Sequence, residues 1–75
     1  MKQLSIMLKS IDQVKTFVNE VSGIDDDVFL RSGRYVIDAK SIMGIFSLDL
    51  SKLLTVEIEN WNEDYMNIFQ KYLVE

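Results

Sequence analysis

The sequence predicts an α+β fold in which an antiparallel sheet packs against helices on one of its two faces. In four short segments apolar residues alternate with other residues, which is the pattern of strands with one buried face. Between these segments apolar residues recur at spacings of three and four, the pattern of helices with one buried side. The elements follow the order strand, helix, strand, strand, helix, strand, helix. Because each strand has a single apolar face, we expect all helices to cover that face, as in a two-layer open-faced sandwich.

The chain begins with a predicted strand and helix. Residues 4–8 place leucine or isoleucine at every second position, which predicts the first strand. Ser10 precedes a helix predicted over 11–22, and Gln13 stands where its side chain completes a capping box. Gly23 stands where a residue in the left-handed conformation commonly ends a helix. The apolar side of this helix is predicted to comprise Ile11, Val14, Phe17, Val18 and Val21.

A β-hairpin is predicted next. Segments 28–31 and 35–38 are short and apolar, and residues 32–34 between them form a turn signal. The acidic segment 25–27 before the hairpin lacks the ligand spacing of a calcium-binding loop, and we interpret it as a solvated turn. Alternation predicts that Val28, Leu30, Ile37 and Ala39 face the helices, whereas Phe29, Arg31, Val36 and Asp38 face away.

The second half contains a short helix, a strand and a final helix. The short helix is predicted over 41–48, with Ser41 at its N-cap. Residues 54–58 alternate between apolar and polar side chains, which predicts a fourth strand with Glu57 on its solvated face. Asn62 is expected to cap the final helix. The apolar side of that helix is predicted to comprise Tyr65, Met66, Ile68, Phe69, Tyr72 and Leu73.

Composition narrows the function. The length suits a single domain, residues 1–75. The sequence contains no cysteine and no histidine, so it offers neither a thiolate ligand nor an imidazole base, and we expect no metal and no cofactor. A net charge of −4 argues against a nucleic-acid partner. Because no apolar run approaches membrane-spanning length, we expect a cytoplasmic protein without a membrane partner.

One segment carries a family resemblance. The string KSIMG at residues 40–44, followed by SL at 47–48, closely resembles a segment of the HPr family, the histidine-containing phosphocarriers of the bacterial sugar phosphotransferase system. The order of the predicted elements is also that of the family, and the match is specific over roughly 27–58. The resemblance implies a four-stranded antiparallel sheet with the strand order 1-4-2-3 and three helices on one face.

The resemblance also locates the active site of the family, and here the sequence departs from it. Family members carry a phosphoryl-accepting histidine at the start of the first helix, followed two residues later by an arginine. Counting back without gaps from KSIMG places Ser10 at the histidine position and Asp12 at the arginine position. No histidine activates a serine nucleophile here, and Asp12 repels a phosphate that the arginine would attract. We therefore expect that phosphoryl transfer through this site is lost and that the protein is not an enzyme.

A second site of the family persists in the sequence. In many bacteria the serine of KSIMG is phosphorylated by a dedicated kinase, and the helix surface beside it contacts partner proteins. Ser41 occupies the serine position, and Ile42, Met43 and Phe46 fall on the contact surface. The role of Ser41 is also explained by helix capping alone. The three apolar residues are explained by a partner protein, by the edge of the core or by a homodimer contact.

Two functions are compatible with these residues. In the first, an HPr-like protein without the histidine is a non-catalytic regulatory or protein-interaction module. It docks an unidentified protein, such as a kinase or a transcriptional regulator, through the helix over 41–48. In the alternative, the protein is a component of the phosphotransferase system that is regulated by phosphorylation at Ser41. The two differ in whether modification of Ser41 is the essential event.

Overall fold

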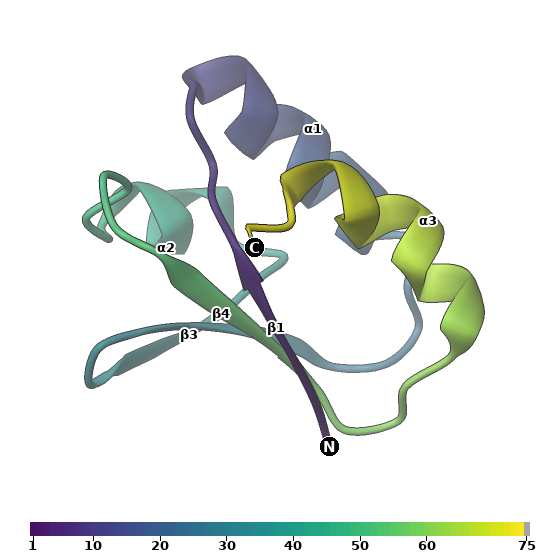
Figure 1. Cartoon of the computed structure of the whole chain (residues 1–75). Coiled ribbons are helices and arrows are strands. Elements are labelled where there is room, and N and C mark those ends of the chain that lie inside the picture. The colour runs from purple at the N-terminus through teal and green to yellow at the C-terminus, as the bar shows by residue number, and fades with distance from the viewer. Residues whose placement is uncertain (75) are drawn as a thin grey trace.

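The computed structural model describes residues 1–74, and its elements follow the predicted order (Figure 1). The strands are β1 (Lys2–Ile6), β2 (Val28–Ser32), β3 (Tyr35–Asp38) and β4 (Leu54–Ile58). The helices are α1 (Ile11–Val21), α2 (Ile42–Phe46) and α3 (Met66–Phe69), and 3₁₀ turns over Glu63–Tyr65 and Gln70–Tyr72 extend α3 at both ends. No helix within residues 1–74 has the length and apolar character needed to cross a membrane.

The four strands form one antiparallel sheet in the order β1-β4-β2-β3, and the helices pack on one face of it (Figure 1). Both the predicted fold class and the strand order implied by the resemblance are therefore confirmed. β4 lies between β1 and β2, where Val56 pairs with Leu4 on one side and with Leu30 on the other. This register aligns the apolar faces of the central strands beneath the helices.

The side chains of the sheet alternate as the sequence predicts. Val28, Leu30 and Ala39 are buried, whereas Phe29 and Val36 on the opposite face are exposed. The buried core lies between the sheet and the helices, and its members come from every strand except β3 and from all three helices. They are Ile6, Leu8, Val14, Phe17, Val21, Ile24, Val28, Leu30, Ala39, Ile45, Leu54, Val56, Ile58, Phe69 and Tyr72.

Aromatic side chains join α1 to the C-terminal helical segment. The Phe17 ring centroid lies 6.0 Å from that of Phe69 and 5.3 Å from that of Tyr72, the second pair in an edge-to-face arrangement. The Tyr72 hydroxyl donates to Glu20 on α1 at 2.8 Å, and Lys71 Nζ donates to the same carboxylate at 2.8 Å. Burial and the hydrogen bond to Glu20 both raise the pKa of Tyr72. The phenol therefore stays protonated and holds the two helices together.

The chain after α3 returns along the outer edge of β1. Met7 N–H donates to the Tyr72 carbonyl at 3.0 Å, and Val74 N–H donates to the Ser5 carbonyl at 3.0 Å. Leu73, which the sequence assigns to the final helix, lies beyond its end and forms an isolated bridge with Ile6. Part of the β1 edge is thus covered, whereas within residues 1–74 β3 pairs only with β2.

Several predicted boundaries are wrong. The expectation that Gly23 adopts the left-handed conformation is incorrect, since Gly33 is the only residue within 1–74 with a positive φ, at 57°. Instead, Ser22 caps α1, because its N–H and its hydroxyl both donate to the Val18 carbonyl, at 3.0 and 2.6 Å. The short helix ends at Phe46 rather than at the predicted residue 48. Ser47 caps it, because its hydroxyl donates to the Gly44 carbonyl at 2.5 Å.

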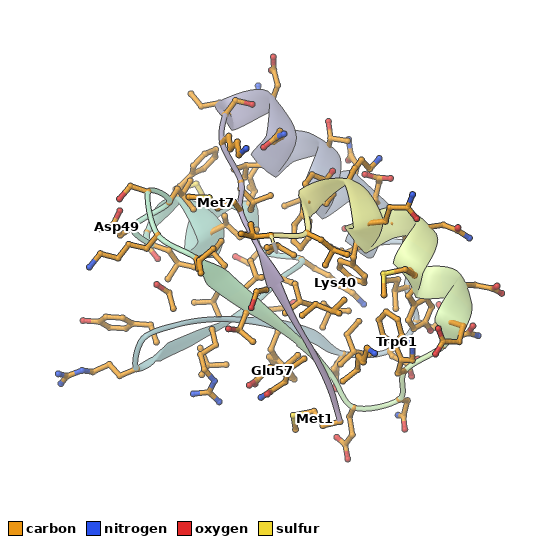
Figure 2. All side chains as sticks on the ribbon, in the orientation of Figure 1. Met1, Met7, Lys40, Asp49, Glu57 and Trp61 are labelled. Atoms are coloured by element: carbon orange, nitrogen blue, oxygen red, sulfur yellow. The ribbon has the colours of Figure 1, made fainter. Side chains whose placement is uncertain are left out.

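Glu57 departs from the prediction that it lies on a solvated face. It does point away from the helices, below the sheet in Figure 2, yet it is only 6% exposed. Arg31 Nε donates to its carboxylate at 3.0 Å and Gln3 Nε2 donates at 2.8 Å, one from each neighbouring strand. Alternation correctly predicted that Glu57 lies on the face away from the helices. It did not predict that Glu57 is buried, because Gln3 on β1 and Arg31 on β2 cover it.

Candidate functional site

Ser10 begins α1 and forms the predicted capping box. Its Oγ accepts from the Gln13 N–H at 3.1 Å, and Gln13 Oε1 accepts from the Lys9 N–H at 2.6 Å. Backbone N–H groups at a helix start are those that bind a phosphate in other proteins. Here one of them is used by Ser10 itself, so Ser10 acts as a helix cap.

Asp12 lies exposed in the first turn of α1. A carboxylate at this position is stabilised by the positive end of the helix dipole. The same charge disfavours a second anion nearby, since two unit negative charges about 4 Å apart repel by about 1 kcal/mol in water and by more where water is excluded. The start of α1 is therefore suited to helix capping and unsuited to holding a phosphoryl group.

A shallow groove of about 480 Å³ opens beside Ser10. Its lining is mostly apolar and comes from the loop between β1 and α1 and from the loop between α2 and β4. The lining residues are Met7, Leu8, Lys9, Ser10, Ile11, Leu50 and Ser51. Figure 2 labels Met7 at this end of the molecule, close to the start of α1 and to α2. Among these residues Lys9 alone is ionisable, so the lining offers no paired acid and base for catalysis.

Ser41 caps α2 in the way that the sequence predicts. Its Oγ accepts from the Gly44 N–H at 3.1 Å, and Ser41 itself is exposed. Gly44 permits the close packing around this cap, because a Cβ on it would lie 3.2 Å from Ser41 Oγ and 3.3 Å from Ile37 Cδ1. The geometry therefore accounts fully for a serine at position 41 as a structural residue, while leaving its side chain accessible to solvent.

Lys40, the residue before Ser41, is directed away from the cap. Its Nζ donates to the Ile24 carbonyl at 2.6 Å and to the Asp26 carbonyl at 3.1 Å. Asp26 also accepts from the Tyr65 hydroxyl at 2.7 Å, which raises the pKa of Tyr65. Hydrogen bonds at Asp26 thus connect the acidic segment to Lys40, which precedes α2, and to Tyr65 of the C-terminal helical segment. The prediction of a wholly solvated turn is wrong for that residue, although Asp25 and Asp27 are exposed.

Two of the three apolar residues predicted to contact a partner are exposed. Met43 is 76% exposed and Phe46 is 41% exposed, whereas Ile42 is half-buried and packs against the core. Ile45 on the inner side of α2 is fully buried and anchors the helix. We refer to Met43 and Phe46 as the α2 surface.

Ile11 lies on the surface, although the sequence pattern predicts that it is buried. The spacing of three and four placed it on the buried side of α1, but it is 63% exposed. It is the first residue of α1, and it lines the groove together with Leu50, which follows Phe46 by four residues. The available signal was its position directly after the N-cap, where a helix extends beyond the core that it covers.

The structure therefore divides the predicted residues between two helices that pack against each other. Ser10 and Asp12 lie at the start of α1, and Ser41, Met43 and Phe46 lie on or before α2. Within residues 1–74 no side-chain hydrogen bond joins these two groups. Of these residues only Ser10 lines the groove described above.

Comparison with known proteins agrees with this architecture. A family model described as the PTS HPr component phosphorylation site matches residues 13–71. That match begins after Ser10 and Asp12 and covers more than half of the chain. A comparison with curated proteins gives no match.

Solved structures show the same fold. HPr-C-His from Thermoanaerobacter tengcongensis is similar with a TM-score of 0.79 and 24% sequence identity, covering 95% of this chain and 89% of that one. A phosphocarrier protein HPr from Bacillus anthracis str. Ames is similar with a TM-score of 0.73 and 23% identity, covering 97% of this chain and 96% of that one. The structural similarity shows the fold, and the family match shows that the chain belongs to the HPr family of the phosphotransferase system.

Proposed function

We propose that this HPr-family chain is a non-catalytic regulatory module that binds a protein partner through the α2 surface. The observation that carries the proposal is the exposure of Met43 and Phe46 on a helix whose Ile45 is fully buried. The Ser41 cap and the buried Ile45 fix the orientation of the helix, so its outer side carries Met43 and Phe46. Ile11, which is also exposed, and the groove beside Ser10 offer further apolar surface at the start of α1.

The chemistry at the start of α1 supports a role without phosphoryl transfer. Transfer through the family's site uses an imidazole as the nucleophile, and the 75 residues include no histidine. Ser10 is occupied as a cap, and Asp12 adds a negative charge where a phosphate would bind. Without phosphoryl transfer, the fold and the α2 surface are the features that can still bind a partner protein.

The composition of the α2 surface suits protein binding. Methionine is flexible and polarisable, so it adapts to irregular partner surfaces. Aromatic side chains such as Phe46 supply much of the contact area at interfaces. Burying apolar area is worth about 25 cal/mol per Å², and a few central residues usually dominate the affinity. A charge placed at Met43 is therefore expected to weaken binding while leaving the fold intact.

The test is a capture experiment followed by titration. The wild-type chain is immobilised, proteins retained from a cell extract are identified, and the retained protein is purified and titrated against three chains. Wild type and Leu53→Asp, an exposed apolar residue outside α2, are expected to bind equally. Met43→Asp is expected to weaken binding at least about tenfold, equivalent to about 1.4 kcal/mol. Equal binding by all three chains would contradict the proposal.

A second function is favoured by the exposure of Ser41. A kinase of the phosphotransferase system would add a phosphate at the start of α2, where backbone N–H groups favour negative charge. Intact-mass measurement after incubation with the family's serine kinase and ATP tests this alternative. A gain of one phosphoryl group that persists in Ser47→Ala but is lost in Ser41→Ala would support it, and an unchanged mass of the wild-type chain would exclude it.

A further inference from the structure

The outer edge of β3 is open for strand pairing. Within residues 1–74 β3 pairs only with β2, while the other outer strand, β1, is partly covered by the C-terminal segment. Natural proteins commonly protect such an edge with proline, lysine or a bulge. β3 has the sequence Tyr-Val-Ile-Asp, with no proline and no lysine, so its protection is limited to its length of four residues and the charge of Asp38. Its exposed side chains include Tyr35 and Val36.

The hairpin determines which backbone groups point outward. The turn contains two residues, Gly33 and Arg34, so Ser32 and Tyr35 form the hydrogen-bonded pair that closes it. Along an antiparallel ladder, hydrogen-bonded pairs alternate with pairs that are not hydrogen-bonded. Ala39, four residues after Tyr35, is again hydrogen-bonded, because its N–H donates to the Val28 carbonyl at 2.9 Å. The backbone N–H and C=O groups of Val36 therefore point away from β2, toward the open edge.

The charges beside Val36 favour pairing with an identical strand. Arg34 precedes Val36 by two residues and Asp38 follows it by two, so the positive and negative charges are placed symmetrically about it. In an antiparallel pair centred on Val36, Arg34 lies in the turn directly before β3, next to the end of the second strand at Asp38, which its long side chain can reach. Oppositely charged residues that face each other across strands stabilise the pair, whereas like charges destabilise it.

We propose that the β3 edge is a self-association surface, through which two copies of this chain pair antiparallel about a two-fold axis at Val36. Val36 N–H of each copy donates to the Val36 carbonyl of the other, and Arg34 of each copy forms an ion pair with Asp38 of the other. The two sheets then join into one, with all four charges neutralised in pairs.

The side chains on both faces of the strand fit this arrangement. On the face away from the helices, Val36 of one copy lies against Val36 of the other, with the exposed Phe29 of β2 diagonally beside each of them. On the helix face, Tyr35 lies opposite Ile37 of the second copy. Ile37 Cδ1 already approaches Gly44 of α2, so α2 packs over the helix face of β3. The proposed pairing uses neither Met43 nor Phe46, and its test is independent of the proposed function.

The opposite charges distinguish self-pairing from binding of an unrelated strand. In solution the wild-type chain is expected to show a concentration-dependent monomer–dimer equilibrium by sedimentation, measured up to about 1 mM, where even weak association is detectable. Arg34→Glu and Asp38→Arg each place like charges opposite each other and are expected to weaken dimerisation about tenfold or more. An equimolar mixture of these two variants is expected to regain the dimer, because opposite charges then face each other in the mixed pair.

Lys15→Glu is the control, since it changes the net charge as Arg34→Glu does but lies exposed on α1. It is expected to dimerise like wild type. Amide hydrogen exchange gives a second readout: Val36 N–H is expected to become protected as concentration rises, whereas Ile37 N–H, which is bonded to β2, stays unchanged. A chain that is monomeric throughout, with a Val36 amide that exchanges rapidly at every concentration, overturns the proposal and leaves the edge to a strand of another protein. Dimerisation that is insensitive to both charge reversals overturns it as well.

Discussion

Arg31 and Glu57 form an ion pair between adjacent strands on the face of the sheet that no helix covers. Arg31 Nε lies 3.0 Å from Glu57 Oε2, and the Glu57 carboxylate is largely shielded from water by its neighbours. The hydrogen bond from Arg31 lowers the pKa of Glu57, and the hydrogen bond from Gln3 acts in the same direction against the effect of burial. This pair links β2 to β4 outside the hydrophobic core.

Removing the arginine alone is expected to destabilise the protein. In Arg31→Met, the Glu57 carboxylate loses its cation while remaining poorly hydrated, and an uncompensated buried charge is unfavourable. The double variant Arg31→Met/Glu57→Leu removes both charges and is expected to recover part of the lost free energy of unfolding. Urea titration of the three chains measures this difference. A double variant less stable than Arg31→Met would contradict the account.

Stability is expected to fall on the acidic side. Because the folded-state pKa of Glu57 lies below its ordinary value of 4.5, its contribution is fully present above that value and is lost as pH falls through the folded pKa. Glu20 changes in the same direction, because hydrogen bonds from Lys71 and Tyr72 outweigh the effect of burial on its pKa.

Glu57→Gln tests this pH dependence against an exposed neighbour. Thermal unfolding followed from pH 7 to below 4 is expected to show a weaker loss of stability for Glu57→Gln than for wild type. Glu59→Gln, whose side chain is exposed, is expected to follow wild type. The same slope for all three chains would show that Glu57 does not carry the effect.

Loss of the α2 cap is expected to have a modest and specific cost. Ser41→Ala removes the acceptor for the Gly44 N–H, and such changes typically destabilise by about 1 kcal/mol. Ser41→Asn retains a capping oxygen and is expected to remain within a few tenths of a kcal/mol of wild type. Denaturant unfolding distinguishes the two, and equal stability of both variants would show that the cap contributes nothing.

Truncation of Phe17 is expected to unfold the protein. Phe17 is fully buried and contacts the rings of Phe69 and Tyr72. Removal of a buried phenylalanine typically costs about 3 to 5 kcal/mol, comparable to the whole stability that a core of this size supplies. Circular dichroism is expected to show loss of cooperative unfolding in Phe17→Ala and its retention in Phe17→Leu. A folded and cooperative Phe17→Ala chain would mean that the aromatic cluster is not the centre of the core.

The sequence contained enough information for the elements and for the faces of the strands. Periodicity identified the buried sides of β2 and β4, because a one-residue shift would have exposed Val28, Leu30 and Val56. The strand order was not available from periodicity and came from the KSIMG resemblance. The burial of Glu57 could not be predicted, since it depends on Gln3 and Arg31, which are distant in the chain and adjacent only across the sheet.

The candidate site was predicted in part. Ser10, Asp12 and Ser41 were placed correctly at the starts of two helices, because caps and charges at helix ends are local features. Ile42 proved half-buried and Ile11 exposed, since the sequence alone does not reveal where a helix extends past the core. The pairing of Leu73 with Ile6 was not predicted, because it depends on the path that the chain takes after its last helix.

The most direct test of the central claim is intact-mass measurement after incubation with phosphoenolpyruvate and the general phosphotransferase enzyme of the family, with an authentic histidine-containing HPr as the positive control. We expect the control to gain the mass of one phosphoryl group and this chain to remain unchanged. A phosphoryl group on this chain, located by fragmentation at Ser10 or Asp12, would contradict the account.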